Sequence, residues 1–504
     1  MGLTRRAALA APAAVALAVG AWGLDRGTLW RDEAVTWQVA RRTLPEIWHL
    51  AASVDAVHAL YYTLVHALFA VDPDPGEVVL RLPSLLGAAA TAALVAELGV
   101  RLARPRVGLW AGLAYAVTPL VSRYAQEGRS YALVAALVAL ATVFFTARRW
   151  GAYAAVLAAA GLLHVFALLV VPAHLLSLRL AGYPPADRRR WALAAGAACA
   201  AVAPLLWWSL GQTGQVDWLE RPGAEAVGRL VADFAGPVPA VTAVVPALAA
   251  AGLWAAPRVA AVAAPLLLVP PALLLGVSQL EPLYYDRYVL FALPGLPLLA
   301  AASLDALPAV LPAALSALPS RWRAARAAGA RPARPPGRRP AAVAYGLAGV
   351  LLVAAGFWTQ YPVHARLRTP ESRGDDFAAV ARAARSLVRP GDAVLYVPDM
   401  GRRIALAYPD GFRAAADVGL SVPGPRSGTL YGTETDPATL GSRLARHDRV
   451  WLVLTNEAAK DPGRPPATPA EHAKRALLRT EFAETGRRRL VHGRVVLVRY
   501  ERLP

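Results

Sequence analysis

Long apolar stretches separated by short clusters of arginine dominate the first 360 residues of the chain. Eleven of them reach or approach the roughly 20 apolar residues that a helix needs to cross a bilayer. The pattern therefore predicts an α-helical polytopic membrane protein with about eleven spans. The expected spans are 7–22, 82–102, 107–121, 130–146, two within 150–180, 191–210, 236–256, 259–277, 288–307 and 341–358.

The arginine clusters give these spans a direction. Two arginines at 148–149 and three at 188–190 flank the apolar stretch 150–180. Arginines mark the cytoplasmic ends of spans, so this stretch is predicted to be a hairpin of two spans that turns near His164 on the outer side. The arginines at 5–6 place the N-terminus in the cytoplasm, and an odd number of spans places the C-terminus outside the plasma membrane.

Composition divides the chain into further parts. Residues 1–320 are predicted to form the transmembrane domain, with a polar first outer loop at 23–80. An Arg, Ala and Pro-rich segment at 321–340 predicts a basic cytoplasmic linker close to anionic lipid, before a last transmembrane helix at 341–358. Short apolar runs then alternate with helical patterns, so 359–504 is predicted to be a soluble extracytoplasmic α/β domain. Its expected helices are 375–387, 437–445 and 469–478, and its expected strands are 393–397, 450–455 and 491–499.

Charge and cysteine content exclude several classes of protein. The formal net charge of the 504 residues is +19, and nearly all the positive charge is arginine. A basic total can indicate nucleic-acid binding, but these arginines stand between apolar spans, so membrane topology explains them and no nucleic-acid partner is expected. Cys199 is the only cysteine, which rules out an intrachain disulfide. No phosphate-binding loop or dinucleotide motif is present in the sequence.

Several ionisable residues are expected at the outer ends of spans, against the positive-inside trend. Such groups at a membrane edge tend to line a cavity or a substrate path. Arginine suits phosphate because its planar fork makes bidentate charge-assisted bonds, and neighbouring carboxylates add a proton acceptor. A lipid-linked phosphosugar fits a site of this kind. The residues are Asp32, Glu33, His58, Arg123, Glu127, Arg129, His164, Asp286 and Arg287.

Short motifs in the same places resemble a known family. The segments 29–34 (LWRDEA) and 55–62 (DAVHALYY) are similar to the first outer loop of GT-C glycosyltransferases. The branch is glycosyltransferase family 39, with the protein O-mannosyltransferases and aminoarabinose transferases. The segments 81–84, 123–131 and 286–288 match that branch too, except that Gly128 stands where it usually has alanine. The resemblance covers residues 1 to about 300 and leaves the C-terminal domain without a match.

The resemblance implies an inverting transfer of a sugar, such as mannose or another hexose, from a polyprenyl-phosphate donor. The acceptor would be an outer-face glycan, lipid or protein. Asp32 matches the acid of the family's first loop and is expected to be the base, with Glu33 in reserve. Arginines would hold the phosphate, tyrosines would line the donor pocket, and an Asp–His pair would orient the acceptor or the loop. The expected substrate-binding residues are Arg129, Arg287, Tyr288, Asp55, His58, Arg81, Tyr131 and His164.

Other interpretations of these residues stay open. Asp32 would also suit a helix cap, and Arg129 beside Glu127 or Arg287 beside Asp286 would suit a structural ion pair. A transporter or flippase of lipid-linked sugars would use the same arginine-edged cavity, and a membrane-anchored scaffold is a third class. Some GT-C enzymes use a divalent cation and others do not, so a metal requirement stays undecided and no metal ligand is assigned.

Overall fold

The computed structural model describes residues 4–72, 75–215, 218–316 and 338–504. Its contacts divide the chain into two compact units. The bundle unit contains Met1–Trp22, Leu82–Trp207 and Val216–Ala365, and the loop–domain unit contains Gly23–Arg81, Trp208–Gln215 and Arg366–Pro504. The first outer loop, which the sequence analysis grouped with the transmembrane domain, thus clusters with the C-terminal domain. Most of the predicted linker 321–340 lies outside the described residues.

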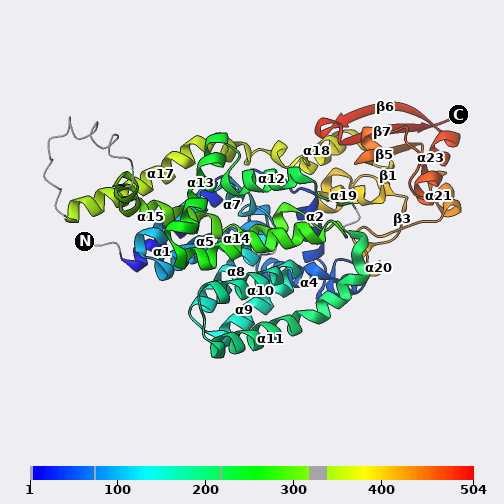
Figure 1. Cartoon of the computed structure of the whole chain (residues 1–504). Coiled ribbons are helices and arrows are strands. Elements are labelled where there is room, and N and C mark those ends of the chain that lie inside the picture. The colour runs from blue at the N-terminus through cyan, green and yellow to red at the C-terminus, as the bar shows by residue number, and fades with distance from the viewer. Residues whose placement is uncertain (1–3, 73–74, 216–217, 317–337) are drawn as a thin grey trace. The chain divides into compact units, whose positions relative to one another are not determined.

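A helix or a broken helix pair occupies each of the eleven expected spans (Figure 1). Most helices begin and end within a few residues of the predicted limits. The exceptions are α11, which starts early at Pro185, and α15 and α17, which end late at Ser316 and Arg366. Helix α5 starts at Glu77, so the first outer loop ends before residue 80. The elements are α1 (Arg5–Ala21), α5 (Glu77–Leu102), α6 (Pro105–Ala116) with α7 (Pro119–Tyr124), α8 (Tyr131–Thr146), α9 (Trp150–Leu163), η2 (Val165–Leu169) with α10 (Val170–Leu180), α11 (Pro185–Ser209), α13 (Pro239–Ala255), α14 (Pro257–Val277), η4 (Asp286–Ala292) with α15 (Gly295–Ser316), and α17 (Arg338–Arg366).

Only some of these helices are long enough to cross a bilayer without a break. Within the described residues, 4 helices pass by length and composition, and up to 6 if each bent pair is one span. The bent pairs are α12 (Ala224–Ala235) with α13, at 89°, and η4 with α15, at 42°. Breaks such as Thr118-Pro119 between α6 and α7 shorten the others, because proline lacks the N–H that continues a helix.

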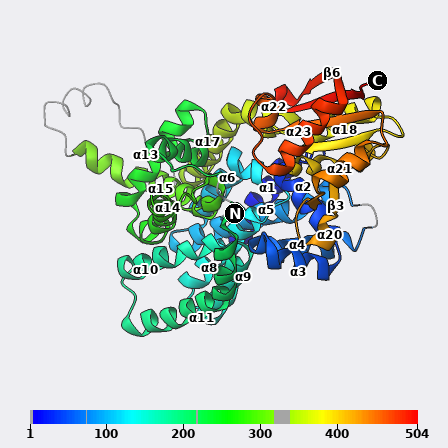
Figure 2. The ribbon, with the colours of Figure 1, turned by 90° about the vertical axis from the view of Figure 1, so that its right-hand side faces the viewer.

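Small residues allow the bundle helices to approach closely. A Cβ atom added at Gly99 on α5 would lie 2.6 Å from the Cα of Gly108 on α6, so only glycine fits there. Helix pairs in membranes commonly pack through such small residues. Further along the bundle, α8 packs against α9 and α10 packs against α14 (Figures 1 and 2).

The C-terminal part of the loop–domain unit is built on a five-stranded sheet in the order β2-β1-β5-β7-β6. Its strands are β1 (Ala393–Val397), β2 (Ala416–Asp417), β5 (Arg449–Thr455), β6 (Phe482–Leu490) and β7 (Val495–Arg502). The first three are parallel, whereas β7 runs antiparallel to β5 and β6. Leucines of α21 (Pro437–Leu444) and α23 (Pro469–Glu481) join alternate strand residues in one core.

The first outer loop folds against this domain within the same unit. It forms α2 (Arg31–Ala40), α3 (Leu44–Ser53), η1 (Ala56–His58) and α4 (Ala59–Phe69). The Leu29 N–H donates to the Tyr408 hydroxyl at 2.9 Å, and the Arg42 guanidinium donates to the carbonyls of Thr429 and Leu430, each at 3.0 Å. Helix α2 also contacts α19 (Arg403–Ala407). Side chains of the loop and of the C-terminal domain therefore satisfy backbone groups of each other.

Candidate functional site

Helix α2 presents two acids in its first turn. The helix begins at Arg31 after Trp30, which makes no side-chain capping bond, so Asp32 is not the capping residue. Carboxylates in a first helical turn interact favourably with the helix dipole. Asp32 is half-buried, whereas Glu33 is fully buried.

Glu33 is held by Arg81, at the start of α5, in a two-pronged ion pair. The Nε–Oε1 distance is 2.8 Å and the Nη2–Oε2 distance is 2.9 Å. The same guanidinium donates to the carbonyls of Leu24 at 2.8 Å and Gly27 at 3.0 Å. Both charged side chains are at most 1% exposed. This geometry ties the beginning of the first loop to α2.

Tyr431, from the C-terminal domain, lies near both Asp32 and Asp55 of the loop. Burial raises the pKa of Tyr431, the Arg403 guanidinium opposes that rise, and the carboxylates of Asp32 and Asp55 add to it. Tyr431 also packs against the small core that contains Val35 of α2 and Tyr62 of α4. The surroundings of Asp32 therefore include Tyr431, a residue that no sequence motif indicates.

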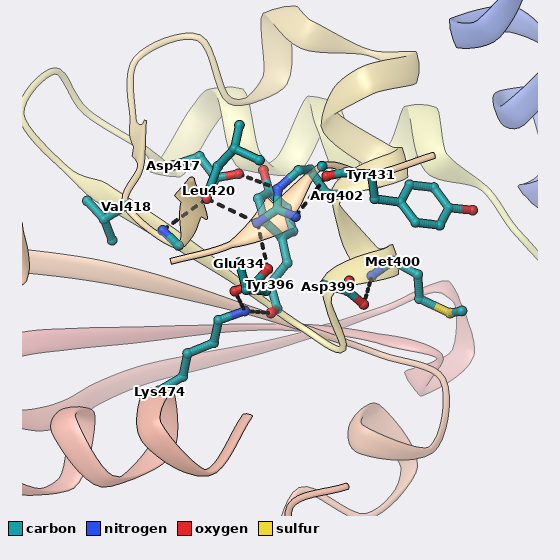
Figure 3. A network of polar contacts seen from close by, with 12 residues as sticks. Tyr396, Asp399, Met400, Arg402, Asp417, Val418, Leu420, Tyr431, Glu434 and Lys474 are labelled. Atoms are coloured by element: carbon teal, nitrogen blue, oxygen red, sulfur yellow. Dashed lines mark hydrogen bonds and ion pairs between the residues drawn. The ribbon is translucent and has the colours of Figure 1, made fainter. Parts of the chain in front are cut away.

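A buried charged network holds the chain at Tyr431 in place (Figure 3). The Arg402 guanidinium donates to the Tyr431 carbonyl at 3.0 Å and pairs with Asp417 at 2.5 Å and Glu434 at 2.9 Å. Glu434 in turn pairs with Lys474 at 2.5 Å. Opposite charges buried together compensate one another's desolvation, so this network suits a positioning role.

Asp55 directly precedes η1, and its carboxylate binds side chains of η1 and α4. Its backbone has a φ of 63°, a left-handed value that Asp adopts more readily than most residues. The His58 Nδ1 lies 2.5 Å from one carboxylate oxygen, and the Tyr62 hydroxyl donates to the other. Asp55 and His58, both predicted site residues, are thus coupled to each other in the loop–domain unit.

Four other predicted residues meet in the bundle unit. Tyr131 begins α8, His164 follows α9, and Arg287 and Tyr288 lie in η4. The ring centroids of Tyr131 and His164 are 5.5 Å apart, and those of His164 and Tyr288 are 5.1 Å apart. The Arg287 guanidinium carbon lies 5.5 Å from the Tyr131 ring and 4.3 Å from the Tyr285 ring. These residues form what we call the arginine–aromatic cluster: Tyr131, His164, Phe166, Tyr285, Arg287 and Tyr288.

Arg129 comes two residues before Tyr131 of this cluster and is buried, with 7% of its surface exposed. Its carbonyl accepts a bond of 2.8 Å from the Ser84 hydroxyl, and its N–H donates to the Glu127 carbonyl at 2.8 Å. The neighbouring Gln126 amide donates to the carbonyls of Gly20 and Trp22, each at 2.8 Å. The backbone that carries Arg129 is therefore fixed on both sides.

The predicted site residues thus form two groups, each within its own unit. The bundle unit holds Arg129 and the arginine–aromatic cluster, and the loop–domain unit holds Asp32, Glu33, Asp55, His58 and Arg81. Phe166 and Tyr285 were missed, although both lie within two residues of predicted ones. Tyr431 carried no local signal, since it stands in a loop without a pattern. Among the described residues, no three His, Cys, Asp or Glu side chains gather as a metal-binding group.

Comparison with known proteins identifies the fold. No family model matches the chain, and no curated protein matches it. The crystal structure of ArnT from Cupriavidus metallidurans in the apo state matches 97% of this chain and 97% of its own, with a TM-score of 0.59 and 16% identity. The structure of the same protein bound to undecaprenyl phosphate matches with the same coverage and identity and a TM-score of 0.55. The chain has the fold of ArnT.

The ArnT fold confirms the predicted fold class, a polytopic helical bundle with a small C-terminal α/β domain. Because the match covers 97% of the chain, it extends to the C-terminal domain, for which the sequence had no match. With its apolar helices, the chain is a multi-pass membrane protein with a small soluble α/β domain.

Proposed function

We propose that the chain is a membrane glycosyltransferase that moves a hexose, such as mannose, from a polyprenyl phosphate to an extracytoplasmic glycan, lipid or protein. The main support is the ArnT fold over almost the whole chain, since one ArnT structure holds undecaprenyl phosphate. Transfer from such a donor needs positive charge for the phosphate and a base for the acceptor. The described residues offer both.

The arginine–aromatic cluster is our candidate for donor binding. A guanidinium group binds phosphate oxygens with two parallel hydrogen bonds, and Arg287 is oriented by the faces of neighbouring tyrosines. As the bond between the anomeric carbon and the phosphate oxygen breaks, negative charge grows on the phosphate. Arg287 and Arg129 would stabilise that charge. Tyr131, Tyr288 and His164 would pack against the donor beside it.

Asp32 is our candidate for the base. It would take the proton from the acceptor hydroxyl as that oxygen attacks the anomeric carbon from the side opposite the phosphate, which inverts the configuration. We assign Glu33 and Arg81 to holding the loop in place, because both carboxylate oxygens of Glu33 already accept hydrogen bonds from the Arg81 guanidinium. Asp55 and His58 would orient the segment that meets the acceptor.

The arginine clusters support a sidedness for this reaction. Their positions favour a cytoplasmic N-terminus and an extracytoplasmic C-terminal domain in the plasma membrane. Asp32 and the C-terminal domain belong to one compact unit, so both would lie on the outer face.

Replacing Asp32 with Asn tests the proposal directly. Purified protein in lipid nanodiscs is given a labelled polyprenyl-phosphate hexose and a membrane extract as the source of acceptor. Loss of a general base typically slows a reaction by about 10² to 10⁴-fold, so Asp32→Asn should lose transfer to that degree while binding the donor normally.

Asp25→Asn is the matched control, because Asp25 is an exposed carboxylate of the same loop. It should transfer at the wild-type rate. Full activity of Asp32→Asn would remove Asp32 as the base. Wild-type protein that carries the labelled lipid across the bilayer without transferring sugar would instead support a flippase.

A further inference from the structure

The C-terminal domain has a pocket of about 260 Å³ at the carboxyl end of β5. Thr455 ends that strand and Asn456 follows it, and Arg403 comes from α19, in the segment after the parallel strand β1. In open α/β sheets, ligands bind in the crevice outside the carboxyl ends of parallel strands. The pocket lies entirely within the loop–domain unit and shares no lining residue with the arginine–aromatic cluster.

Positive charge exceeds negative charge around this pocket. Four cations and two acids line it, a formal excess of two. The acids are already engaged, since Asp375 pairs with Arg31 at 2.8 Å and Glu457 with Lys460 at 2.7 Å. The two remaining cations are Arg403 and Arg494.

These remaining arginines are bonded to neutral groups. The Arg403 Nη2 donates to the Asn456 side-chain carbonyl at 3.3 Å, and the Arg494 Nη1 donates to the Gly374 carbonyl at 3.2 Å. Neither bond neutralises the charge of its guanidinium. An anion in the pocket would do so, and arginine is suited to phosphate in particular.

Two buried polar atoms of the pocket lack a hydrogen-bond partner within the described residues. They are the Thr455 hydroxyl and the Arg403 Nε, on side chains of residues that are 2% and 6% exposed. Buried polar groups are nearly always hydrogen-bonded, so each exception needs an explanation. A ligand with several oxygen acceptors would satisfy both atoms.

The size of the pocket limits the ligand. Its volume is below the roughly 300–1,000 Å³ of pockets that hold drug-sized molecules. A polyprenyl chain would not fit, whereas a single sugar ring with a phosphate group would.

We propose that this pocket binds a phosphorylated sugar that forms part of the acceptor. The identity of the ligand as acceptor rests on the proposed function, but the recognition of a sugar phosphate does not. The pocket is close to the proposed base, because Arg31 lines the pocket and directly precedes Asp32 on α2. Arg403 also contacts Tyr431, the residue that lies near Asp32.

Calorimetric titration of the full-length protein in nanodiscs tests the pocket without any donor. A hexose 1-phosphate should bind, inorganic phosphate should bind more weakly, and the neutral hexose should not bind. Equal binding of inorganic phosphate and hexose phosphate would overturn the sugar assignment. Failure of both to bind would overturn the pocket as a phosphate site.

Substitutions then locate the binding. Arg403→Gln and Thr455→Val should each weaken hexose phosphate binding by roughly tenfold, the scale of one lost hydrogen bond to a charged group. Arg488→Gln is the matched control, since Arg488 is exposed on β6 and does not line the pocket. Equal loss in the control would overturn the location.

Thr455→Val keeps the test valid if Arg403→Gln fails to fold. The Thr455 hydroxyl bonds to no described residue, so valine should leave the melting temperature unchanged or raise it while binding falls. Unchanged binding in Thr455→Val would exclude the hydroxyl from a ligand site.

Activity separates the two proposals. Asp32→Asn should lose transfer yet bind hexose phosphate like wild type. Hexose phosphate binding by a wild-type protein that transfers no sugar would overturn only the proposed function. Sugar transfer by a protein that binds no hexose phosphate would overturn only the pocket.

Discussion

At the scale of single residues, two neighbouring acids differ in what surrounds them. Glu33 is fully buried and bonded at both oxygens to Arg81, while Asp32 is half-buried in the same helical turn. Sequence alone ranks them only by their match to a family motif. The structure separates them by environment, because a carboxylate already committed to a buried guanidinium is poorly placed to accept a substrate proton.

Replacing Glu33 with Gln should therefore affect folding. Removing one partner of a buried ion pair leaves the other charge uncompensated, which typically costs about 3–5 kcal/mol. We expect a clearly lower melting temperature for Glu33→Gln, measured by thermal unfolding of the purified protein in detergent.

Glu484→Gln provides the comparison, since Glu484 pairs with Arg487 on the exposed strand β6. Exposed ion pairs contribute little, so its melting temperature should stay near that of the wild type. If Glu33→Gln melts like the wild type but transfers no sugar, Glu33 acts in the reaction and the role of holding the loop in place is wrong.

At the scale of elements, the donor site that we propose depends on the ends of helices. Tyr131, His164 and Arg287 lie where α8 begins, where α9 ends and where η4 begins. Side chains at helix ends can converge on one point while the helices themselves stay packed along their lengths. Such a cluster would bind a ligand through the separate contributions of several elements.

Arg287→Lys tests the cluster while keeping its charge. Lysine is a point charge and cannot make the two parallel bonds of a guanidinium, so we expect the KM for the donor to rise about tenfold with a smaller change in kcat. Steady-state kinetics with varied polyprenyl-phosphate hexose measures this.

The exposed Arg229→Lys on α12 is the control and should behave as the wild type. Unchanged donor kinetics in Arg287→Lys would argue against the cluster as the donor site.

Elements with a distinctive pattern were predictable from the sequence. The strand β1 lies at Ala393–Val397 as expected, because its apolar run is bounded by Asp392 and Pro398. The strand β6 was missed, since it is a sheet edge made mostly of exposed polar residues, including three successive arginines. Charged edge strands prevent unwanted pairing with other chains, but their polar sequence is typical of a loop. The expected strand 491–499 also included the turn Val491–Gly493.

The candidate site was predictable where its residues lie near recognisable motifs. Tyr131, His164, Arg287 and Tyr288 were all expected, and they meet in one unit. The place of Tyr431 was not, because it packs against a core that includes Val35, almost 400 residues away in the chain. Local patterns carry no information on such contacts, which tertiary packing determines.

At the scale of the whole molecule, the first outer loop and the C-terminal domain form one compact unit although they lie at opposite ends of the sequence. The loop has a small core of its own around Ile47 and Tyr62, to which Leu430 of the domain contributes. Polar contacts such as Arg31–Asp375 and Leu29–Tyr408 add to it. A loop held in this way should depend on the domain for its structure.

Ending the chain after Ala365 should therefore leave the bundle unit in the membrane but release the loop. We expect 23–76 to become sensitive to limited proteolysis, because the hydrogen-bond partners of Leu29, Gln38 and Arg42 are gone. Transfer should be lost, since Asp32 lies in that loop, while donor binding should persist through the arginine–aromatic cluster.

Tyr408→Phe is a milder form of the same change. It removes a hydroxyl that accepts from the Leu29 N–H and donates to Glu77 at 2.6 Å, without removing the domain. Cleavage of the loop should be faster than in the wild type and slower than in the truncated chain. A truncated chain that keeps a protected loop and wild-type transfer would show that the domain is dispensable for both. Loss of donor binding on truncation would instead show that the domain takes part in holding the lipid.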